Sequence, residues 1–425
     1  MPAQKNEPVR ERCVCPESMG NHMSCAYESG QPGQPQGLRR PRLAKRTSRS
    51  ASSVRGSPMP TKELVHSSQS ALPPSLRFSV RRSGNQASGR PMRRHWGGIP
   101  ERGSAGSMRF SSCKSRTRLI DKDASSEVKG DMQLPSDVAQ VFDEWKRRGH
   151  FYRLAEGHQC FVVQEGAGPD VVLVHGFPST SHDFAAAMPE IIAQGYRVTT
   201  WDHLGFGFSD KPSDPAVSYS LLDQARRAGE IVAAHGVKQA RVVGHDMGLT
   251  MAVEMLCQQE EGKLPFEIET LVLCNGSHLI ELARLTPVQY ALMTDEGAAE
   301  FARTYDPERF AQAFKFLWAD PSKTPEVDIR AIAYWIPWNG GLNVLGRIAR
   351  YNIERRTYAK RWRSILERTK VPVRIVWGEF DPIAVRAIAE KLAQMTKGRC
   401  TIMPNVGHYP QMEEPSNWAD LVLSN

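Results

Sequence analysis

The sequence predicts an α/β fold in which a mostly parallel β-sheet is flanked by helices. From residue 171 onward, short apolar segments typical of buried strands alternate with segments of helical periodicity. One transition is sharp, because the apolar run that begins at Val242-Val243 ends in Gly-His-Asp-Met-Gly at residues 244–248, after which apolar residues continue at helical spacing. The two glycines allow a tight turn and close packing of helix on strand, so Asp246 between them is predicted to project from the carboxyl end of the sheet.

The basic charge of the chain is concentrated in its first 131 residues. This segment holds 24 Lys and Arg against 10 Asp and Glu, whereas the remaining residues hold 31 against 36. It is rich in Ser, Arg, Pro and Gly and has almost no sustained apolar periodicity, so it cannot bury enough apolar surface to offset the entropy of ordering. Residues 1–131 are therefore predicted to be a disordered basic extension.

Three functional roles compete for this extension: a nucleic-acid-binding arm, a tether to anionic membranes, or an organellar transit peptide. Glu7, Glu11 and Glu17 interrupt the positive charge where a transit peptide would form its amphipathic helix. We favour an extension without a specific function, or a translation start near Met132. Nucleic-acid binding is therefore not expected.

The cysteine pattern and the apolar segments favour a cytoplasmic protein that needs no cofactor. The eight cysteines form no Cys-x-x-Cys pair, which favours reduced thiols, and no signal peptide is recognised. No segment approaches the roughly 18 apolar residues of a membrane span. The sequence shows neither a His/Cys ligand cluster nor a phosphate-binding loop, so no metal and no organic cofactor is expected. The oligomeric state stays open.

Helices and strands are expected on both sides of the turn. A helix is expected from about residue 136, with Val138, Phe142 and Trp145 on one face, and another at residues 221–234. Strands are expected at residues 151–154, 160–164, 171–174, 196–202, 241–244, 271–274, 373–377 and 400–403.

Residues 277–368 interrupt the alternation with mostly helical sequence rich in Trp and Tyr. Such a segment predicts a helical cap that excludes water and lines an apolar substrate pocket. The predicted organisation is a core formed by residues 132–276 and 369–425, with a cap at residues 277–368.

An aspartate at the sharp turn favours attack on saturated carbon. Attack on an acyl group would give an anhydride, whereas attack on an epoxide carbon, or on a carbon bearing a halide, gives an alkyl ester of Asp246. Hydrolysis of that ester requires a histidine base, a carboxylate that orients the histidine, and an oxyanion hole.

Five motifs give the chain a resemblance to the α/β-hydrolase superfamily over about residues 171–418. They occur in the order and spacing of that superfamily: His-Gly-Phe-Pro at 175–178, Gly-Phe-Gly-Phe-Ser-Asp-Lys-Pro at 205–212, the turn at 244–248, Gly-Glu-Phe-Asp-Pro at 378–382 and Gly-His-Tyr-Pro at 407–410. The chain resembles the subset with an aspartate nucleophile, which contains epoxide hydrolases and haloalkane or haloacid dehalogenases. Within that subset it looks closest to the mesoderm-specific-transcript branch. The resemblance implies an eight-stranded, mostly parallel sheet with a helical cap.

The resemblance also assigns the parts of the reaction. Asp246 is expected to be the nucleophile, His408 the base, and Asp381 the carboxylate that orients His408, in the chain order nucleophile, acid, base. Asn275 follows the strand after which some dehalogenases carry this acid, so the absence of a carboxylate there favours Asp381.

The backbone N–H groups of Phe177 and Met247 are expected to form the oxyanion hole. Related haloalkane dehalogenases usually place Asn or Trp at the first position and Trp at the second, where these side chains hold the departing halide. The side chains of Phe177 and Met247 cannot donate hydrogen bonds, which disfavours a halide and favours an epoxide.

Epoxide hydrolases use tyrosines of the cap as acids that protonate the opening oxygen. Tyr351 is the main candidate, because residues 351–355 resemble the tyrosine-bearing helix of those enzymes; the other candidates are Tyr290, Tyr305, Tyr334 and Tyr358. A basic run around Trp362 is interpreted as solvated surface, and consists of Arg355, Arg356, Lys360, Arg361 and Arg363.

The sequence therefore predicts a hydrolase that acts on a small apolar substrate, with an epoxide favoured. Two alternatives stay open: a haloalkane or haloacid dehalogenase that uses the same ester, and a catalytically weak binding protein that has kept the fold.

Overall fold

Eight strands form one sheet within residues 132–424, the part of the chain that the computed structural model describes. The predicted disordered extension, residues 1–131, lies outside the described residues. The strand order is β1-β2-β4-β3-β5-β6-β7-β8, in which β2 is antiparallel to both neighbours and every other pair is parallel. The strands are β1 (His150–Arg153), β2 (Gln159–Gly166), β3 (Asp170–Val174), β4 (Arg197–Trp201), β5 (Gln239–His245), β6 (Glu267–Cys274), β7 (Val373–Gly378) and β8 (Arg399–Met403).

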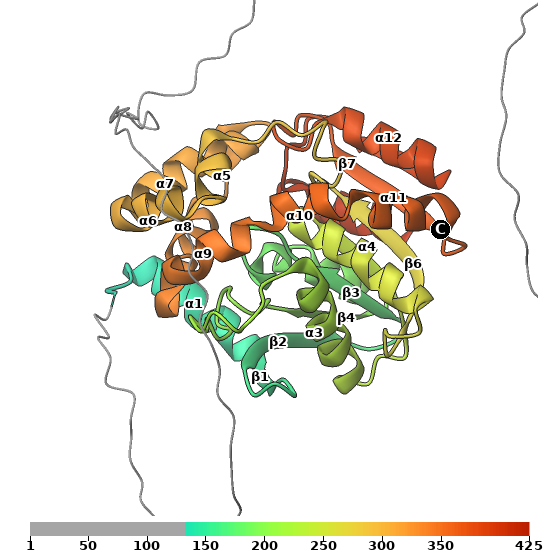
Figure 1. Cartoon of the computed structure of the whole chain (residues 1–425), viewed down its shortest axis with the longest axis horizontal. Helices are drawn as coiled ribbons and strands as arrows, with labels where there is room; N and C mark the ends of the chain where they lie inside the picture. The colour runs from blue at the N-terminus through green and yellow to red at the C-terminus, as the bar shows by residue number, and fades with distance from the viewer. Residues whose placement is uncertain (1–131, 425) are drawn as a thin grey trace, which may run out of the picture. The chain divides into compact units, whose positions relative to one another are not determined.

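The predicted fold class, a mostly parallel eight-stranded sheet flanked by helices, is confirmed. Helices lie on both faces of the sheet, as Figure 1 shows for α3, α4 and α12 on the near side. The helices outside the segment between β6 and β7 are α1 (Ser136–Arg148), α2 (Met188–Ala193), α3 (Leu221–Ala234), α4 (Met247–Glu260), α12 (Arg386–Thr396), α13 (Pro410–Glu413) and α14 (Pro415–Leu423), with a 3-10 turn η2 (Ser181–Phe184).

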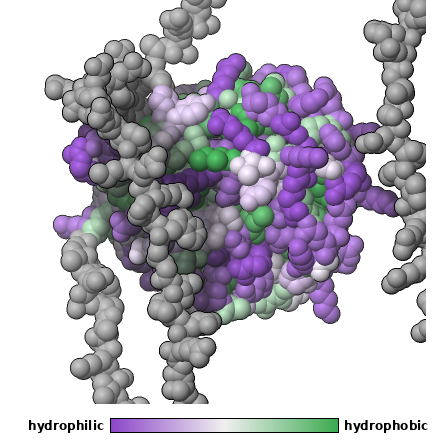
Figure 2. Space-filling view, viewed as in Figure 1, coloured by the Kyte–Doolittle hydropathy of each residue, from purple (hydrophilic) through white to green (hydrophobic). Residues whose placement is uncertain are grey.

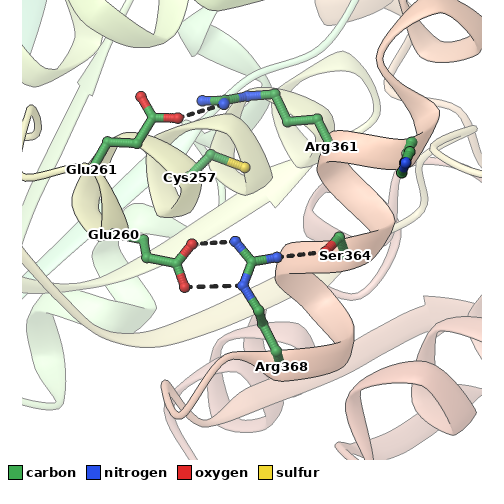
Figure 3. A pocket seen from close by; sticks show the side chains of 7 residues that line it. Cys257, Glu260, Glu261, Arg361, Ser364 and Arg368 are labelled. Carbon is green, nitrogen blue, oxygen red and sulfur yellow. Dashed lines mark hydrogen bonds and ion pairs between the residues drawn. The ribbon is translucent and has the colours of Figure 1, made fainter. Parts of the chain in front are cut away.

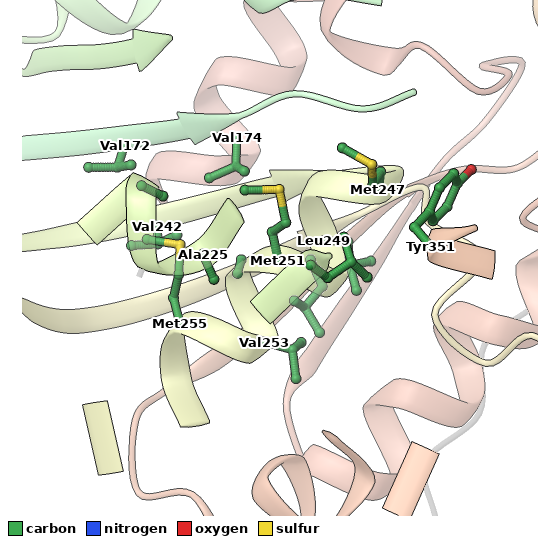
Figure 4. Close-up of a cluster of buried hydrophobic side chains, with 14 of the residues drawn as sticks. Val172, Val174, Ala225, Val242, Met247, Leu249, Met251, Val253, Met255 and Tyr351 are labelled. Carbon is green, nitrogen blue, oxygen red and sulfur yellow. The ribbon is translucent and has the colours of Figure 1, made fainter. Parts of the chain in front are cut away.

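Side chains that alternate along the strands supply two apolar layers. Val172 and Val174 of β3 pack in a cluster with residues of α3, α4 and α12, whereas Val171 and Leu173 pack in a cluster with residues of α1, α2 and α14. Figure 4 shows the first cluster, in which Met251 of α4 lies next to the valines of β3. Because both faces are covered, β3 is apolar along nearly its whole length, as expected for a buried parallel strand.

The strand order creates a switch point at β3. This strand pairs with β4 on one side and with β5 on the other, so the loops that follow β3 and β5 leave the sheet next to each other. Sheets of this kind bind ligands in the crevice at the carboxyl ends of the strands, at such a point. The loop after β3 carries Phe177, and the turn after β5 carries Asp246.

The segment between β6 and β7, residues 275–372, is called the insertion below. It contains only helices and 3-10 turns, in agreement with the helical sequence predicted for residues 277–368, while its role as a cap stays a prediction. Figure 1 shows α10 and α11 leading from the rest of the insertion toward α4. The elements are α5 (Pro287–Leu292), α6 (Asp295–Thr304), α7 (Pro307–Phe314), η3 (Lys315–Leu317), η4 (Pro321–Lys323), α8 (Glu326–Trp335), η5 (Trp338–Gly340), α9 (Leu342–Ala349), α10 (Tyr351–Thr357) and α11 (Ala359–Arg368).

The surface is mostly hydrophilic in the view of Figure 2, with small, separate hydrophobic areas between charged residues. Among the helices of residues 132–424, none has the length and apolar character needed to cross a membrane.

Candidate active site

Asp246 lies at the turn between β5 and α4, where the sequence predicted it. Its backbone has φ 49° and ψ −110°, a region that costs a residue with a side chain about 1–3 kcal/mol. The flanking glycines are needed for close packing, because a Cβ at Gly248 would lie 2.1 Å from the carbonyl oxygen of Val174, and one at Gly244 would lie 2.5 Å from that of Gly248. The turn is thus held tightly between β3 and α4, with the Asp246 side chain only 6% exposed.

The Asp246 carboxylate already occupies one of the two predicted oxyanion-hole donors. Its Oδ2 accepts a hydrogen bond of 2.9 Å from the backbone N–H of Phe177. A Cβ at Gly176 would lie 2.6 Å from the Cβ of Asp246, so only glycine allows this approach. Met247 is the first residue of α4, so its backbone N–H is one of the N–H groups of the first turn that have no acceptor inside the helix. Within the described residues Oδ1 of Asp246 accepts no hydrogen bond, which distinguishes the two oxygens.

The structure brings the other two predicted residues together. His408 lies in the loop after β8, and its Nδ1 is 2.7 Å from Oδ2 of Asp381, which follows β7. Oδ1 of Asp381 accepts hydrogen bonds of 2.8 Å from the backbone N–H groups of Ile383 and Ala384. The carboxylate is thereby fixed from both sides and can hold the imidazole in one orientation.

Asn275 contacts the Asp381 carboxylate, a contact that the sequence analysis missed. It follows β6, between the loops after β5 and β7, and its Nδ2 donates a 2.9 Å hydrogen bond to Oδ2 of Asp381. Its Oδ1 accepts a 2.8 Å hydrogen bond from the backbone N–H of Gly378. The sequence analysis considered Asn275 only as a missing carboxylate; a polar residue at the end of a buried strand was the signal that could have marked it.

Two more contacts hold the loop that carries His408. The backbone N–H of His408 donates to the carbonyl of Leu317 in the insertion (2.8 Å), and His245 Nε2 is 2.8 Å from the carbonyl of His408. Burial, with the charge of His408, lowers the pKa of His245 to about 3, so His245 is neutral and can donate this hydrogen bond. His245 of the turn thus connects the backbone next to Asp246 with the loop of His408.

The charges around His408 favour its protonated form in the free protein. Burial alone would lower the pKa of His408, but the Asp381 carboxylate, followed by the charges of Asp246 and Asp183, outweighs burial and raises the pKa to about 9. Burial would likewise raise the pKa of Asp381, but His408 and the hydrogen bonds from Asn275 and Ile383 outweigh it and lower that pKa. The pair is therefore an imidazolium beside a carboxylate when Asp246 is ionised.

Asp183 is a buried carboxyl group beside this pair that the sequence analysis also missed. It lies in η2, and the hydroxyl of Ser179 donates a hydrogen bond to its Oδ2. Burial raises the pKa of Asp183 well above its ordinary value, and the charge of Asp246 adds to this effect. The loop at residues 178–184 is polar and unpatterned, so nothing in the sequence marked this residue.

Helix α10 places Tyr351, the predicted acid, beside Phe177, a predicted oxyanion-hole residue. It is 2% exposed, and its ring centroid lies 5.4 Å from that of Phe177. Its hydroxyl is buried and has no hydrogen-bond partner in the described part of the chain. Burial raises the pKa of Tyr351, and the charge of Asp246 raises it further. The hydroxyl is thus neutral, and the side chains of Asn352 and Gln289, which lower its pKa, are polar neighbours of it.

The other candidate tyrosines have different surroundings. The hydroxyls of Tyr305 and Tyr334 donate hydrogen bonds of 2.7 and 3.1 Å to other groups of the insertion. Tyr290 is 50% exposed, and Tyr358 packs its ring on that of Trp362. Tyr351 is therefore the one that the structure places at Phe177.

The prediction that Arg355 belongs to solvated surface was wrong. Its side chain is 0% exposed, because α10 presents Tyr351 and Arg355, one helical turn apart, to the turn at Asp246. Nη2 of Arg355 donates a 2.9 Å hydrogen bond to the backbone carbonyl of Asp246 and lies 3.9 Å from its Oδ1. Two of the remaining residues of the basic run, Arg356 and Lys360, are exposed as predicted.

A separate pocket lies between α4 and α11, away from these groups. Figure 3 shows that ion pairs span it, between Arg361 and Glu261 and between Arg368 and Glu260. It is lined by Cys257, Glu260, Glu261, Lys360, Arg361, Ser364 and Arg368. None of the predicted site residues lines this pocket. Across residues 132–424, no three His, Cys, Asp or Glu side chains are arranged to hold a metal ion.

The strand order and the placement of these loops are those of α/β hydrolases. The chain belongs to this family, since the family model described as alpha/beta hydrolase fold matches residues 169–415. A curated relative, the putative hydrolase LipZ of Mycobacterium tuberculosis, is 34% identical over 283 residues, which cover 66% of this chain and 96% of the relative.

Two further comparisons agree with the resemblance seen in the motifs. The mesoderm-specific transcript homolog protein of Bos taurus is 28% identical over 302 residues, which cover 68% of this chain and 89% of that protein. The solved structure of the epoxide hydrolase CorEH without ligand superposes with a TM-score of 0.53 and 20% identity, covering 65% of this chain and 96% of that one. This last likeness concerns the fold.

Proposed function

We propose that this α/β hydrolase opens a small apolar epoxide by forming an ester on Asp246 and then hydrolysing that ester with water activated by His408. The observation that carries the proposal is the arrangement of the Asp246 carboxylate. One oxygen, Oδ2, is held by the Phe177 N–H at 2.9 Å, which leaves Oδ1 to attack carbon. A serine at this turn would attack acyl carbon instead, so the aspartate sets the chemistry.

In the first step Oδ1 attacks an epoxide carbon, the C–O bond of the ring breaks, and the ring oxygen leaves as an alkoxide. Tyr351 is the proposed proton donor to that oxygen, supported by its buried, unpartnered hydroxyl near Phe177. The carboxylate of Asp246 becomes a neutral ester, with its carbonyl oxygen Oδ2 already at the N–H of Phe177.

In the second step His408 removes a proton from water, which attacks the ester carbonyl carbon. Ester formation removes the negative charge of Asp246, one of the charges that raise the pKa of His408 to about 9. The imidazole therefore loses its proton more readily in the ester than in the free protein. The base becomes competent when it is needed, while Asp381 keeps the imidazole oriented.

We propose that the insertion, including residues 277–368, acts as the cap of this site. The support is that it supplies Tyr351 and Arg355 beside Asp246 and the Leu317 carbonyl that holds His408. We also propose that the substrate is a small apolar molecule and that the protein is cytoplasmic.

The second candidate function is dehalogenation through the same ester. It is favoured by Asn352, whose buried amide lies beside the Tyr351 hydroxyl and could donate to a halide there. The side chains of Phe177 and Met247, which donate no hydrogen bond, still favour the epoxide.

The test is mass spectrometry of the His408→Gln variant after incubation with a panel of apolar epoxides and haloalkanes. Removal of the base should trap the ester, and an adduct on Asp246 would support the mechanism. An epoxide adduct retains the oxygen of the substrate, whereas a haloalkane adduct has lost the halide, so the mass separates the two candidates. His150→Gln, an exposed histidine on β1, is the matched control and should hydrolyse its ester normally. No adduct from any compound on a folded variant would favour the binding-protein alternative.

A further inference from the structure

We infer that Arg355 is a positioning residue for the hydrolysis of the Asp246 ester, and that its charge stabilises the oxygen that leaves with the product. This inference rests on the proposed function. Neither of the two proposed steps assigns a role to Arg355.

The guanidinium of Arg355 is fixed under the turn that carries the nucleophile. Its Nη2 donates to the Asp246 carbonyl (2.9 Å), its Nε to the hydroxyl of Thr250 (3.0 Å), and its Nη1 to Oδ1 of Asn352 (3.0 Å). It also lies 4.6 Å from the ring centroid of Tyr351. Such a rigid, dry position strengthens electrostatic effects on neighbouring groups.

The position of Arg355 distinguishes between the two oxygens of Asp246. Oδ2 is bound to the N–H of Phe177, whereas Oδ1 is the oxygen that faces Arg355, at 3.9 Å from Nη2. Oδ1 is also the proposed attacking atom. The positive charge therefore lies beside the ester oxygen that joins the enzyme to the substrate.

Charge moves at Oδ1 in opposite directions in the two steps. In the first step the negative charge of Oδ1 is lost as it bonds to carbon, so a neighbouring cation does not speed this step. In the second step the water oxygen bonds to the carbonyl carbon of Asp246, and the bond from that carbon to Oδ1 breaks. The electron pair passes to Oδ1, which takes the proton back from His408 and leaves as the alcohol of the product. Asp246 is left as the carboxylic acid, and its proton returns to the Tyr351 phenolate formed in the first step. Arg355 stabilises the charge on Oδ1 in this second step only.

A purely structural role for Arg355 would have a different signature. The insertion is also attached to α4 through Glu254, which accepts hydrogen bonds from Arg361 (2.8 Å) and from the indole of Trp362 (2.7 Å). Attachment of the helices therefore does not depend on Arg355 alone. If Arg355 only held α10 in place, its loss would slow both steps, because Tyr351 would also be misplaced.

The test measures the formation and the loss of the adduct separately, in single turnovers quenched and analysed by mass spectrometry. The substrate is the compound that labels Asp246 in the His408→Gln variant. We expect Arg355→Met to slow hydrolysis about tenfold to hundredfold and to slow alkylation far less, so that the ester accumulates although His408 is intact.

Two further variants isolate the charge if Arg355→Met does not fold. Arg355→Lys keeps the positive charge and Arg355→Gln keeps a donor without it, so the lysine variant should hydrolyse the ester faster than the glutamine variant. Arg363→Met removes a half-buried arginine of the same insertion, paired with Glu281, and should leave both rates unchanged.

The inference is overturned if the Arg355 variants slow both steps equally, or if lysine and glutamine at this position behave alike. In that case only the inference about Arg355 fails, since the adduct in His408→Gln would still support the proposed function. Absence of any adduct in His408→Gln would instead overturn the proposed function, and the role of Arg355 with it.

Discussion

At the scale of single residues, the site depends on charges that are buried together. His408 is 3% exposed and Asp381 is 4% exposed, and each shifts the pKa of the other toward the ionised pair. Buried pairs of this kind are sensitive to removal of either partner, because the remaining charge lacks compensation. The pairing therefore appears in the pH dependence of stability as well as in the chemistry.

The raised pKa of His408 predicts a pH-dependent stability. A histidine that titrates near 6.5 when unfolded and at about 9 when folded stabilises the folded state in full below pH about 6.5. That contribution is lost as the pH rises through about 9. Between these pH values, we expect the free energy of unfolding of the unmodified protein to fall by on the order of 3 kcal/mol more than that of His408→Gln. Urea unfolding at several pH values measures the difference; equal slopes would contradict the assignment.

Asn275 is predicted to act on one step of the reaction. Asn275→Ala removes the hydrogen bonds to Asp381 and to the N–H of Gly378, so His408 is oriented less well. We expect hydrolysis of the ester to slow about tenfold or more, while alkylation by Asp246 is little changed. Single-turnover kinetics separate the two rates, and an equal loss in both would show that Asn275 supports the site only through the fold.

At the scale of elements, the junction of β5 and α4 sets the geometry of the site. The helix approaches β3 so closely that a Cβ at Gly248 would lie 2.1 Å from the carbonyl oxygen of Val174. This contact also keeps the first turn of α4, with Met247, next to the loop of Phe177. Any side chain at residue 248 must push the helix and the strand apart.

Gly248→Ala is therefore predicted to destabilise the fold by more than about 3 kcal/mol, since a backbone atom blocks the new Cβ. Gly236→Ala is the matched control. Gly236 has φ 77° and no atom within 4 Å of its added Cβ, so it incurs only backbone strain of about 1–2 kcal/mol. Thermal unfolding of both variants compares the two costs, and equal losses would contradict the packing argument.

The positions of Asp246, Asp381 and His408 could be predicted from the sequence because each lies in a short motif that follows a strand. Asn275 also follows a strand, but an asparagine there has no motif to mark it. Arg355 could not be predicted, since a basic run reads as surface unless the face of α10 that packs on α4 is known. Asp183 could not be predicted for the same reason, since its place near His408 depends on how η2 packs in the fold. Local sequence predicts the side chains that follow the strand ends. Side chains from neighbouring helices can be placed only when the packing of those helices is known.

At the scale of the whole molecule, residues 132–424 contain a complete apolar core and all of the groups in the proposed site. The fold class, including the strand number and mostly parallel pairing, was predicted from alternation and from the order of motifs. Strand ends were less accurate, since β6 begins at Glu267 rather than near residue 271.

Deletion of residues 1–131 is predicted to leave stability and adduct formation unchanged, because the core and the proposed site lie in the rest of the chain. Thermal unfolding and labelling of Asp246 in a truncated His408→Gln variant measure both properties. The truncated, otherwise unmodified protein is the control for turnover. A lower midpoint of unfolding, or loss of labelling, would show that the basic segment supports the hydrolase.

The loops after β3, β5, β6, β7 and β8 each contribute one group to the proposed site, in the order Phe177, Asp246, Asn275, Asp381 and His408. The sheet sets the distances between these loops, and each loop sets only its own side chain. A single substitution can therefore exchange the proposed nucleophile while the proposed base, acid and backbone donors keep their places. Such modularity lets one scaffold diversify its chemistry residue by residue, without inventing a new architecture each time.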